Sequence, residues 1–209
     1  MILPFNAATR TMIETRLAAF TRIDEGQYAS GLKRAAVALV MVEAAPELET
    51  SLLLTLRASG LRAHSNQWAP PGGRCDPGET PVQAAIRELH EELGLQLTRD
   101  DVVGVLDDYP TRSGYLITPV VMWAQDSVQL MPNPDEVASV HRIALSQIAR
   151  PQAFDFVAIP ESDRRLIRYS HFGHFIHAPT AALIYQFSEV LAGRTTRVAE
   201  LEQPVFAWK

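Results

Sequence analysis

The spacing of hydrophobic residues predicts a short helix near the start of the 209-residue chain. Ile13, Leu17 and Phe20 follow one another at intervals of four and three residues, which places them on one side of a helix. Charged and polar residues stand between the first two of them. We therefore expect an amphipathic helix over residues 11–23, ahead of the core.

Apolar runs of strand length follow this helix. Residues 35–43 and 51–57 are hydrophobic at nearly every position, which is typical of strands that are buried on both faces. The polar, proline-containing segment 44–50 predicts a turn, so the two runs are expected to form a hairpin or neighbouring strands. Further strand-like runs follow at residues 102–106, 115–124 and 137–143.

A helix in the middle of the chain is marked at both ends. Thr80 can cap its amino end, Pro81 suits the first helical position and Gln83 completes a capping box. Gly94 is suited to end it. A helix is therefore expected over residues 80–93.

The order of these elements predicts the fold class and the domains. Residues 58–73 are expected to form a long loop, and residues 180–191 a last helix with proline before it and glycine after it. Strands on both sides of a central helix, with a helix near the C-terminal end, predict a mixed α/β fold. The expected divisions are an N-terminal helical extension (1–30), one main domain (31–193) and a C-terminal tail (194–209).

Composition limits the partners and the compartment. The hydrophobic fraction of 47% suits one substantial core, and the formal net charge of −5 gives no support for binding nucleic acid or an anionic membrane. The single cysteine, Cys75, excludes an internal disulfide and suits a reducing cytosol. No apolar stretch approaches the ~20 residues that span a bilayer. We expect a soluble cytoplasmic protein, with a two-fold homodimer as the default assembly.

Three carboxylates are expected to share one narrow face of the predicted central helix. Glu88 and Glu92 are one turn apart, and Glu91 sits beside them. Like charges at this spacing oppose helix formation, and divalent cations bound through carboxylate oxygens would relieve the repulsion. Taken alone, the same residues also fit a solvated acidic face. The apolar face of this helix is expected at Val82, Ile86, Leu89 and Leu93.

The residues around the start of this helix add two expectations. Arg87 is expected to point away from the carboxylates and to pair with Glu79, tying the loop to the helix, with a structural or a catalytic role equally open. Gly72 and Gly73 leave no side chain in the way of a metal or phosphate, so a peptide carbonyl at this point is a further candidate ligand.

Residues 73–95 match every fixed position of the Nudix box, at Gly73, Glu79, Arg87, Glu88, Leu89, Glu91, Glu92, Gly94 and Leu95. The chain thus resembles the Nudix hydrolase superfamily. The resemblance implies an α/β/α sandwich around a mixed sheet and metal-dependent hydrolysis of a diphosphate linked to another group. It implies Glu88 and Glu92 as the leading Mg²⁺ or Mn²⁺ ligands, with Glu91 supporting. The carbonyl of Gly72 is a further candidate ligand, and Glu91, Arg87 and Glu79 belong with these residues to the candidate catalytic set.

A further acid beyond the box often binds metal or acts as the base in this superfamily. Glu136, in P-N-P-D-E-V, stands where many members place it, and Asp135 is its competitor. An ordinary turn that leads into a strand explains the same segment.

Residues 53–73, ending in Q-W-A-P-P-G-G, resemble the signature that precedes the box in coenzyme A diphosphatases. Asn66 stands where this branch usually has glycine, Pro70 replaces a phenylalanine, and the interval from Gly73 to Arg87 is one residue shorter than usual.

Three basic side chains in this segment suit phosphate recognition. Arg57, Arg62 and His64 precede the box, and a guanidinium can hold phosphate oxygens bidentately. With Gly73 they form the candidate substrate-binding set. The structural alternative pairs Arg57 with an acid such as Glu43 and leaves Arg62 solvated.

The expected substrate is a small nucleotide diphosphate. Coenzyme A or an acyl derivative would give 3′,5′-ADP and 4′-phosphopantetheine or its acyl form, with Mg²⁺ or Mn²⁺ as the cofactor. ADP-ribose, NADH and nucleoside triphosphates are alternative substrates. A catalytically silent, nucleotide-sensing module is the alternative of another class, but such modules tend to lose glutamates that this chain keeps.

Two further features carry no assigned role. His171, His174 and His177 lie close together, and in one strand their spacing would send the middle one to the opposite face. They fit partly buried strand positions better than a zinc site, because no cysteine or acid stands at ligand spacing. The C-terminal segment 205–208 is suited to cover either a core or a partner surface.

Overall fold

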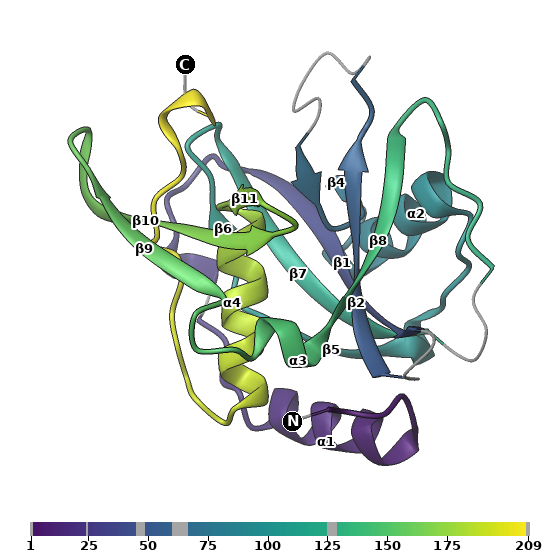
Figure 1. Ribbon diagram of the computed structural model, residues 1–209. Coiled ribbons are helices and arrows are strands. Elements are labelled where there is room, and N and C mark those ends of the chain that lie inside the picture. The colour runs from purple at the N-terminus through teal and green to yellow at the C-terminus, as the bar shows by residue number, and fades with distance from the viewer. Residues whose placement is uncertain (1, 24, 45–48, 60–66, 125–128, 208–209) are drawn as a thin grey trace.

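A computed structural model describes residues 2–23, 25–44, 49–59, 67–124 and 129–207. Within these ranges, eight strands form one sheet, three form a smaller sheet, and helices lie on both faces of the larger one (Figure 1). The larger sheet is mixed, because β1 (Lys33–Ala44) and β7 (Tyr115–Trp123) run parallel and its other described pairings are antiparallel. The predicted α/β/α sandwich is confirmed.

The central strands of the larger sheet lie in the order β3 (Trp68–Ala69), β2 (Glu49–Arg57), β1, β7 and β5 (Val102–Val105). The remaining three strands attach to this path, with β4 (Gly72–Arg74) on β1, β6 (Tyr109–Pro110) on β7 and β8 (Val137–Ala144) on β2. As predicted, β1 and β2 are antiparallel neighbours. Leu52, Leu53 and Leu54 are all fully buried, although successive strand residues point to opposite faces, so both faces of β2 are covered.

The hydrophobic core consists of one layer on each face of this sheet. Ala38 packs in the layer that contains α2 (Pro81–Leu93). Its neighbour Leu39 points the other way and packs in the layer formed with α1 (Ala7–Ala18) and α4 (Thr180–Leu191). The continuous apolar runs of the sequence follow from this covering of both faces.

The first helix begins and ends earlier than its hydrophobic spacing predicted. It starts after Asn6, whose side chain accepts a hydrogen bond from the backbone N–H of Thr9 at 3.0 Å, and it ends at Ala18. The expected range of 11–23 was wrong at both ends. Asn6 caps the helix well before Ile13, which moves its start, and at the other end the helix stops short of Phe20. Ile13 and Leu17 are nevertheless buried, as predicted.

The predicted loop over residues 58–73 was also wrong in part. Its last residues form β3 and the start of β4, which pair with β2 and β1. Residues 60–66 lie outside the described part of the chain.

The smaller sheet was not predicted. It contains β9 (Phe154–Ile159), β10 (Ser162–His171) and β11 (His174–His177), and it follows the short helix α3 (Leu145–Ile148). Its strands mix exposed and buried positions, which is a weaker signal than the continuous apolar runs of the larger sheet. The described 3₁₀ helices are η1 (Glu25–Gln27), η2 (Arg99–Asp101) and η3 (Val205–Ala207).

Both predicted later helices are present. The last one has the predicted bounds, and α2 carries the predicted capping box. The Thr80 hydroxyl accepts a hydrogen bond from the Gln83 backbone at 3.3 Å, and the Gln83 side chain accepts one from the Thr80 backbone at 2.9 Å. None of the described helices is long and apolar enough to cross a membrane.

Replacing Thr80 by alanine removes half of this capping box. We expect Thr80→Ala to lower the free energy of unfolding by about 1 kcal/mol, because an orphan backbone N–H at the helix start loses its partner. Urea unfolding of both proteins measures the difference. Thr11→Ala, at an exposed position inside α1, is the matched control and should change the free energy of unfolding by less than about 0.5 kcal/mol; an equal loss in both variants would contradict the capping role.

Candidate active site

The site is built where α2 passes strand β4. A Cβ atom at Gly73 would lie 2.3 Å from Oε1 of Glu88, and a Cβ at Gly72 would lie 2.3 Å from the carbonyl oxygen of Ala36. A side chain at either position would therefore push the helix or β1 away. The two glycines, expected to form a turn, instead bring a strand directly against the carboxylates of the helix.

Glu92 is the most deeply buried carboxylate of this helix. It is 2% exposed, and its Oε1 lies 3.5 Å from Nη1 of Arg57. Its Oε2 has no hydrogen-bond partner among the described residues. Burial raises the pKa of Glu92 to about 8; the charges of Glu88 and Glu136 add to the shift, while Arg57 and a backbone contact at Gly72 oppose it. A buried carboxylate with an unpartnered oxygen is costly, so this position favours a bound cation.

Glu88 shares this environment. Burial raises its pKa, a hydrogen bond from Arg87 lowers it, and the charges of Glu91 and Glu136 raise it further. Its carboxylate faces β4 at Gly73. Glu88 and Glu92 therefore form a close pair of partly desolvated carboxylates, as their one-turn spacing predicted.

The loop before β8 brings Glu136 to this pair. The backbone N–H of Asn133 donates to the carbonyl oxygen of Glu92 at 2.9 Å, and the Asn133 side chain donates to Oε1 of Glu136 at 3.2 Å. Glu136 influences the pKa of both helix carboxylates, whereas Asp135 is exposed. Of the two acids considered for this position, Glu136 is the one beside the pair.

Arg87 holds the loop before the helix in place. Its Nε and Nη2 donate to the two oxygens of Glu79 at 2.9 and 3.0 Å, and this ion pair lowers the pKa of Glu79. The predicted pairing is present. The expectation that Arg87 points away from the other carboxylates was wrong, because its Nη1 also donates to Glu88 at 2.9 Å and to Glu91 at 3.0 Å. A planar guanidinium has enough donors to bind all three.

Glu91 lies on the solvent side of the helix. Its side chain is 52% exposed and contacts Arg87. The three carboxylates do not share one narrow face, because Glu91 and Glu92 are adjacent in sequence and thus about 100° apart around the helix. The structure brings Glu88 and Glu92 together and leaves Glu91 at the edge.

The donor set fits a hard divalent cation. Across the described ranges, no three histidine, cysteine, aspartate or glutamate side chains form a complete group that could hold a metal. The unpartnered oxygen of Glu92, the neighbouring carboxylate of Glu88 and the nearby Glu136 nevertheless supply oxygen ligands of the type that Mg²⁺ and Mn²⁺ prefer. These three carboxylates outnumber the two guanidiniums that contact them, those of Arg57 and Arg87, so added positive charge would be stabilising there.

A cavity of about 340 Å³ opens beside the two glycines. Arg57, Trp68 and Tyr115 line it together with Arg74, whose guanidinium lies 5.1 Å from the centre of the Tyr115 ring. Lys33 lies over the same ring at 6.0 Å. The cavity therefore has basic side chains near the site of the carboxylates.

The basic residues only partly match those selected from the sequence. Arg57 pairs with Glu92 and not with Glu43, which had been the structural alternative. Arg62 and His64 lie outside the described residues. Arg74 and Lys33 were missed, although their charge at the borders of β4 and β1 was a signal that could have found them.

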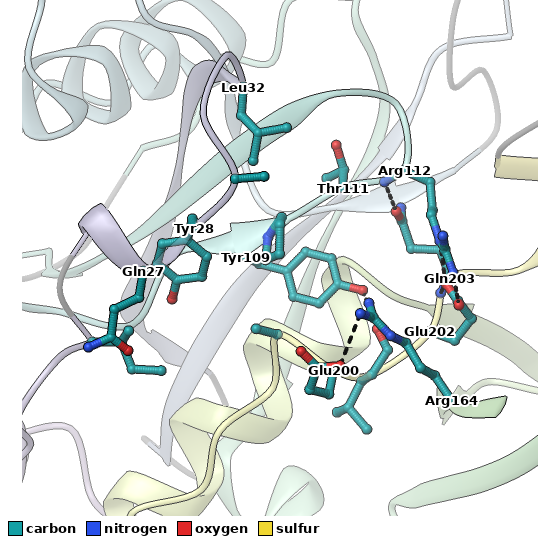
Figure 2. A pocket seen from close by; sticks show the side chains of 15 residues that line it. Gln27, Tyr28, Leu32, Tyr109, Thr111, Arg112, Arg164, Glu200, Glu202 and Gln203 are labelled. Atoms are coloured by element: carbon teal, nitrogen blue, oxygen red, sulfur yellow. Dashed lines mark hydrogen bonds and ion pairs between the residues drawn. The ribbon is translucent and has the colours of Figure 1, made fainter. Parts of the chain in front are cut away.

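A larger cavity, of about 450 Å³, lies elsewhere (Figure 2). Tyr28 and Tyr109 line it, and an ion pair between Arg164 and Glu200 at 3.0 Å crosses its edge. None of the residues that the sequence selected for catalysis, metal binding or substrate binding lines it. Its position does not fit the diphosphate chemistry of the box.

Three histidines, His141, His171 and His174, lie around Trp68, whereas His177 packs on Phe206, and none of them forms a metal site within the described chain. His171 and His174 face each other across the turn between β10 and β11, so they belong to two strands. His141 and His171 lie 4.5 and 5.2 Å from the Trp68 ring. Their role here is packing between the two sheets.

Comparison with known proteins identifies the family. Residues 32–161 match the model of the NUDIX domain. The chain is 32% identical to the Nudix hydrolase NudL of Photorhabdus laumondii, over 66% of this chain and 76% of that protein. It is 30% identical to NudL of Yersinia enterocolitica, over 78% of this chain and 84% of that protein. The crystal structure of a MutT/nudix family protein from Enterococcus faecalis shares the fold, with a TM-score of 0.50, 17% identity and coverage of 81% of this chain and 63% of that one. The chain belongs to the Nudix family and is a diphosphohydrolase that acts on nucleoside diphosphate-linked substrates.

Proposed function

We propose that this Nudix hydrolase cleaves the diphosphate bond of coenzyme A or an acyl derivative, with a divalent metal ion bound by Glu88 and Glu92. The observation that carries the catalytic part is the buried carboxylate of Glu92, whose Oε2 has no hydrogen-bond partner among the described residues. It lies beside Gly72 and Gly73, where a cavity with basic side chains opens.

In this proposal Glu88 and Glu92 bind the metal ion and Glu136 acts as the general base. A divalent ion at Glu88 and Glu92 would neutralise charge on the phosphate oxygens and lower the pKa of a water molecule. Glu136 would accept the proton of the attacking water; support for this role is that Asn133 donates to its carboxylate and that its charge raises the pKa of Glu92. Glu91 is a supporting acid at the exposed edge of the site.

The remaining site residues position these groups. Arg87 and Glu79 join the loop to the helix and hold Glu88 in its orientation. Arg57 partly offsets the charge of Glu92 and lines the cavity, where it can also meet a phosphate oxygen. Gly72 and Gly73 let β4 lie directly against β1 and the Glu88 carboxylate, and a backbone carbonyl there is a further candidate ligand.

Coenzyme A is favoured as substrate by two observations. Residues 53–73 resemble the signature of coenzyme A diphosphatases. Coenzyme A carries a 3′-phosphate besides its diphosphate, and Arg74 and Lys33 add positive charge beside the cavity beyond that of Arg57. An additional phosphate has a matching set of charges there.

A substrate panel tests this proposal. Coenzyme A, ADP-ribose, NADH and nucleoside triphosphates are compared by kcat/KM with Mg²⁺ or Mn²⁺, and coenzyme A is expected to rank first. A preference for compounds without a 3′-phosphate would overturn the coenzyme A assignment and leave the diphosphohydrolase class unchanged.

Removing a metal-binding carboxylate should abolish most of the activity. We expect Glu88→Gln to lower kcat/KM by at least ~100-fold, because a bound metal contributes several kcal/mol of charge stabilisation to the transition state. Glu161→Gln, at an exposed position in the turn between β9 and β10, is the control and should retain activity. Equal activity of the two variants would exclude Glu88 as a ligand.

Metal-free stability should depend on the charge of Glu92. Its pKa is about 8 in the folded chain against an ordinary value of 4.5, so its contribution to the free energy of unfolding falls as pH rises between these values. Glu92→Gln should remove this fall. At pH near 8 it should stabilise the metal-free protein by roughly 1–3 kcal/mol, since each pKa unit corresponds to about 1.4 kcal/mol and the loss of the pairing with Arg57 offsets part of the gain.

Urea unfolding with EDTA across pH 5 to 8 measures this difference. Glu161→Gln, the same substitution at an exposed position in the turn between β9 and β10, is the matched control and should unfold like the wild type. Added Mn²⁺ should stabilise the wild type at pH 8 and have little effect on Glu92→Gln. The same pH dependence in Glu92→Gln and the wild type would contradict a buried, ionisable Glu92.

A further inference from the structure

A second cavity adjoins the one beside the glycines. Its volume is about 190 Å³, and it shares Trp68, Thr180 and Gln203 with the 340 Å³ cavity beside the glycines. We call this smaller space the outer cavity. At its outer side stand Phe175 of β11 and Phe206 of η3. The two spaces are therefore neighbours, with Trp68 at their common border.

The two cavities differ in charge. Arg57 and Arg74 line the one beside the glycines, whereas no aspartate, glutamate, lysine or arginine is among the described residues that line the outer one. His177 lines the outer cavity, and burial together with the charge of Arg168 lowers the pKa of its imidazole. A charged group would lose its hydration in the outer cavity without gaining a partner, so an occupant is uncharged.

Two exposed aromatic rings border the outer cavity. Phe206 is 63% exposed and Phe175 is 48% exposed. The His177 ring packs edge-on against Phe206 with 5.8 Å between the ring centres, and the guanidinium of Arg168 lies 3.9 Å from the centre of Phe175. These contacts hold the rings of Phe175 and Phe206 at the rim of the cavity. An apolar group bound there would remove both rings from water, which is favourable.

The C-terminal segment that carries Phe206 is attached to the domain. The Tyr109 hydroxyl donates to the carbonyl oxygen of Leu201 at 2.7 Å, and the backbone N–H of Arg112 donates to the Gln203 side chain at 2.6 Å. Arg112 also forms an ion pair with Glu202, which lowers the pKa of Glu202 to about 2. The segment thus has the anchoring that a wall of a binding site requires.

We infer that the outer cavity is the subsite for the uncharged arm of the substrate, and that Phe175 and Phe206 select arms that end in an apolar group. The inference rests on the proposed function, because acyl-coenzyme A has a charged nucleotide half and such an arm on opposite sides of its diphosphate. Continuity with the cavity that holds Arg57 and the glycines favours the substrate itself over a separate partner.

A chain-length comparison tests this subsite. The ratio of kcat/KM for hexanoyl-coenzyme A to kcat/KM for coenzyme A is measured in the wild type, Phe206→Ala and Phe175→Ala. The wild-type ratio should be at least about tenfold, because each buried methylene contributes about 0.8 kcal/mol, or roughly a factor of four. Each variant should lower the ratio by about fivefold or more. Phe172→Ala is the matched control, since this ring is 80% exposed on the same hairpin and does not line the outer cavity.

The outcomes separate the subsite from the reaction. Hydrolysis of both compounds with a wild-type ratio near one, or with a ratio that the Phe206 and Phe175 variants leave unchanged, would overturn the subsite and leave the proposed function intact. Hydrolysis of neither compound would overturn both. If Phe206→Ala changes only the oligomeric state, measured by light scattering, the rings belong to an interface between copies of the chain and the inference is wrong.

Discussion

The burial of Glu92 between a helix and the edge of a strand is the constraint on which the site depends. A carboxylate at 2% exposure is tolerated only where opposite charge or strong donors compensate for lost hydration. Arg57 compensates in part, at a contact of 3.5 Å that leaves the second oxygen without a partner among the described residues. The folded chain therefore holds a position that is unfavourable without a cation and favourable with one.

Glycine makes this arrangement possible. β4 approaches both β1 and α2 so closely that the Cβ of any other residue at Gly72 or Gly73 would overlap a carbonyl oxygen or the Glu88 carboxylate. The close approach also exposes backbone on the cavity side, where a phosphate can come near. The same two residues thus bury the carboxylates and open the space for the substrate.

The sequence predicted secondary structure correctly where a short segment carried one strong structural preference. The capping box of α2 and the apolar runs of β1 and β2 predicted those elements and their pairing, because each residue type has one dominant structural preference there. The sequence did not reveal that Arg87 would bind Glu88 and Glu91 besides Glu79, or that Arg57 would reach Glu92. The Arg57–Glu92 contact joins β2 to α2, whose distance in space depends on the whole sheet. Arg87, Glu88 and Glu91 lie on the same helix, and the four-residue interval from Arg87 to Glu91 was a local signal that could have found one of these contacts. The half-exposed strands β9 to β11 carried too weak a periodic signal.

Trp68 packs between the larger and the smaller sheet and also lines two cavities. Trp68 lies against His141 of β8 and His171 of β10, so it joins the two sheets while it also borders both cavities. Trp68, with Thr180 and Gln203, therefore lies between a basic space beside the carboxylates and a space beside Phe206 whose described lining carries no Asp, Glu, Lys or Arg. Burying a charged group without a partner costs free energy, so the charged part of an extended substrate favours the basic cavity and its uncharged part favours the other one. In the proposed function the glutamates of α2 act on the bond that is broken, and the inferred subsite between the smaller sheet and the C-terminal segment acts on the group attached to it.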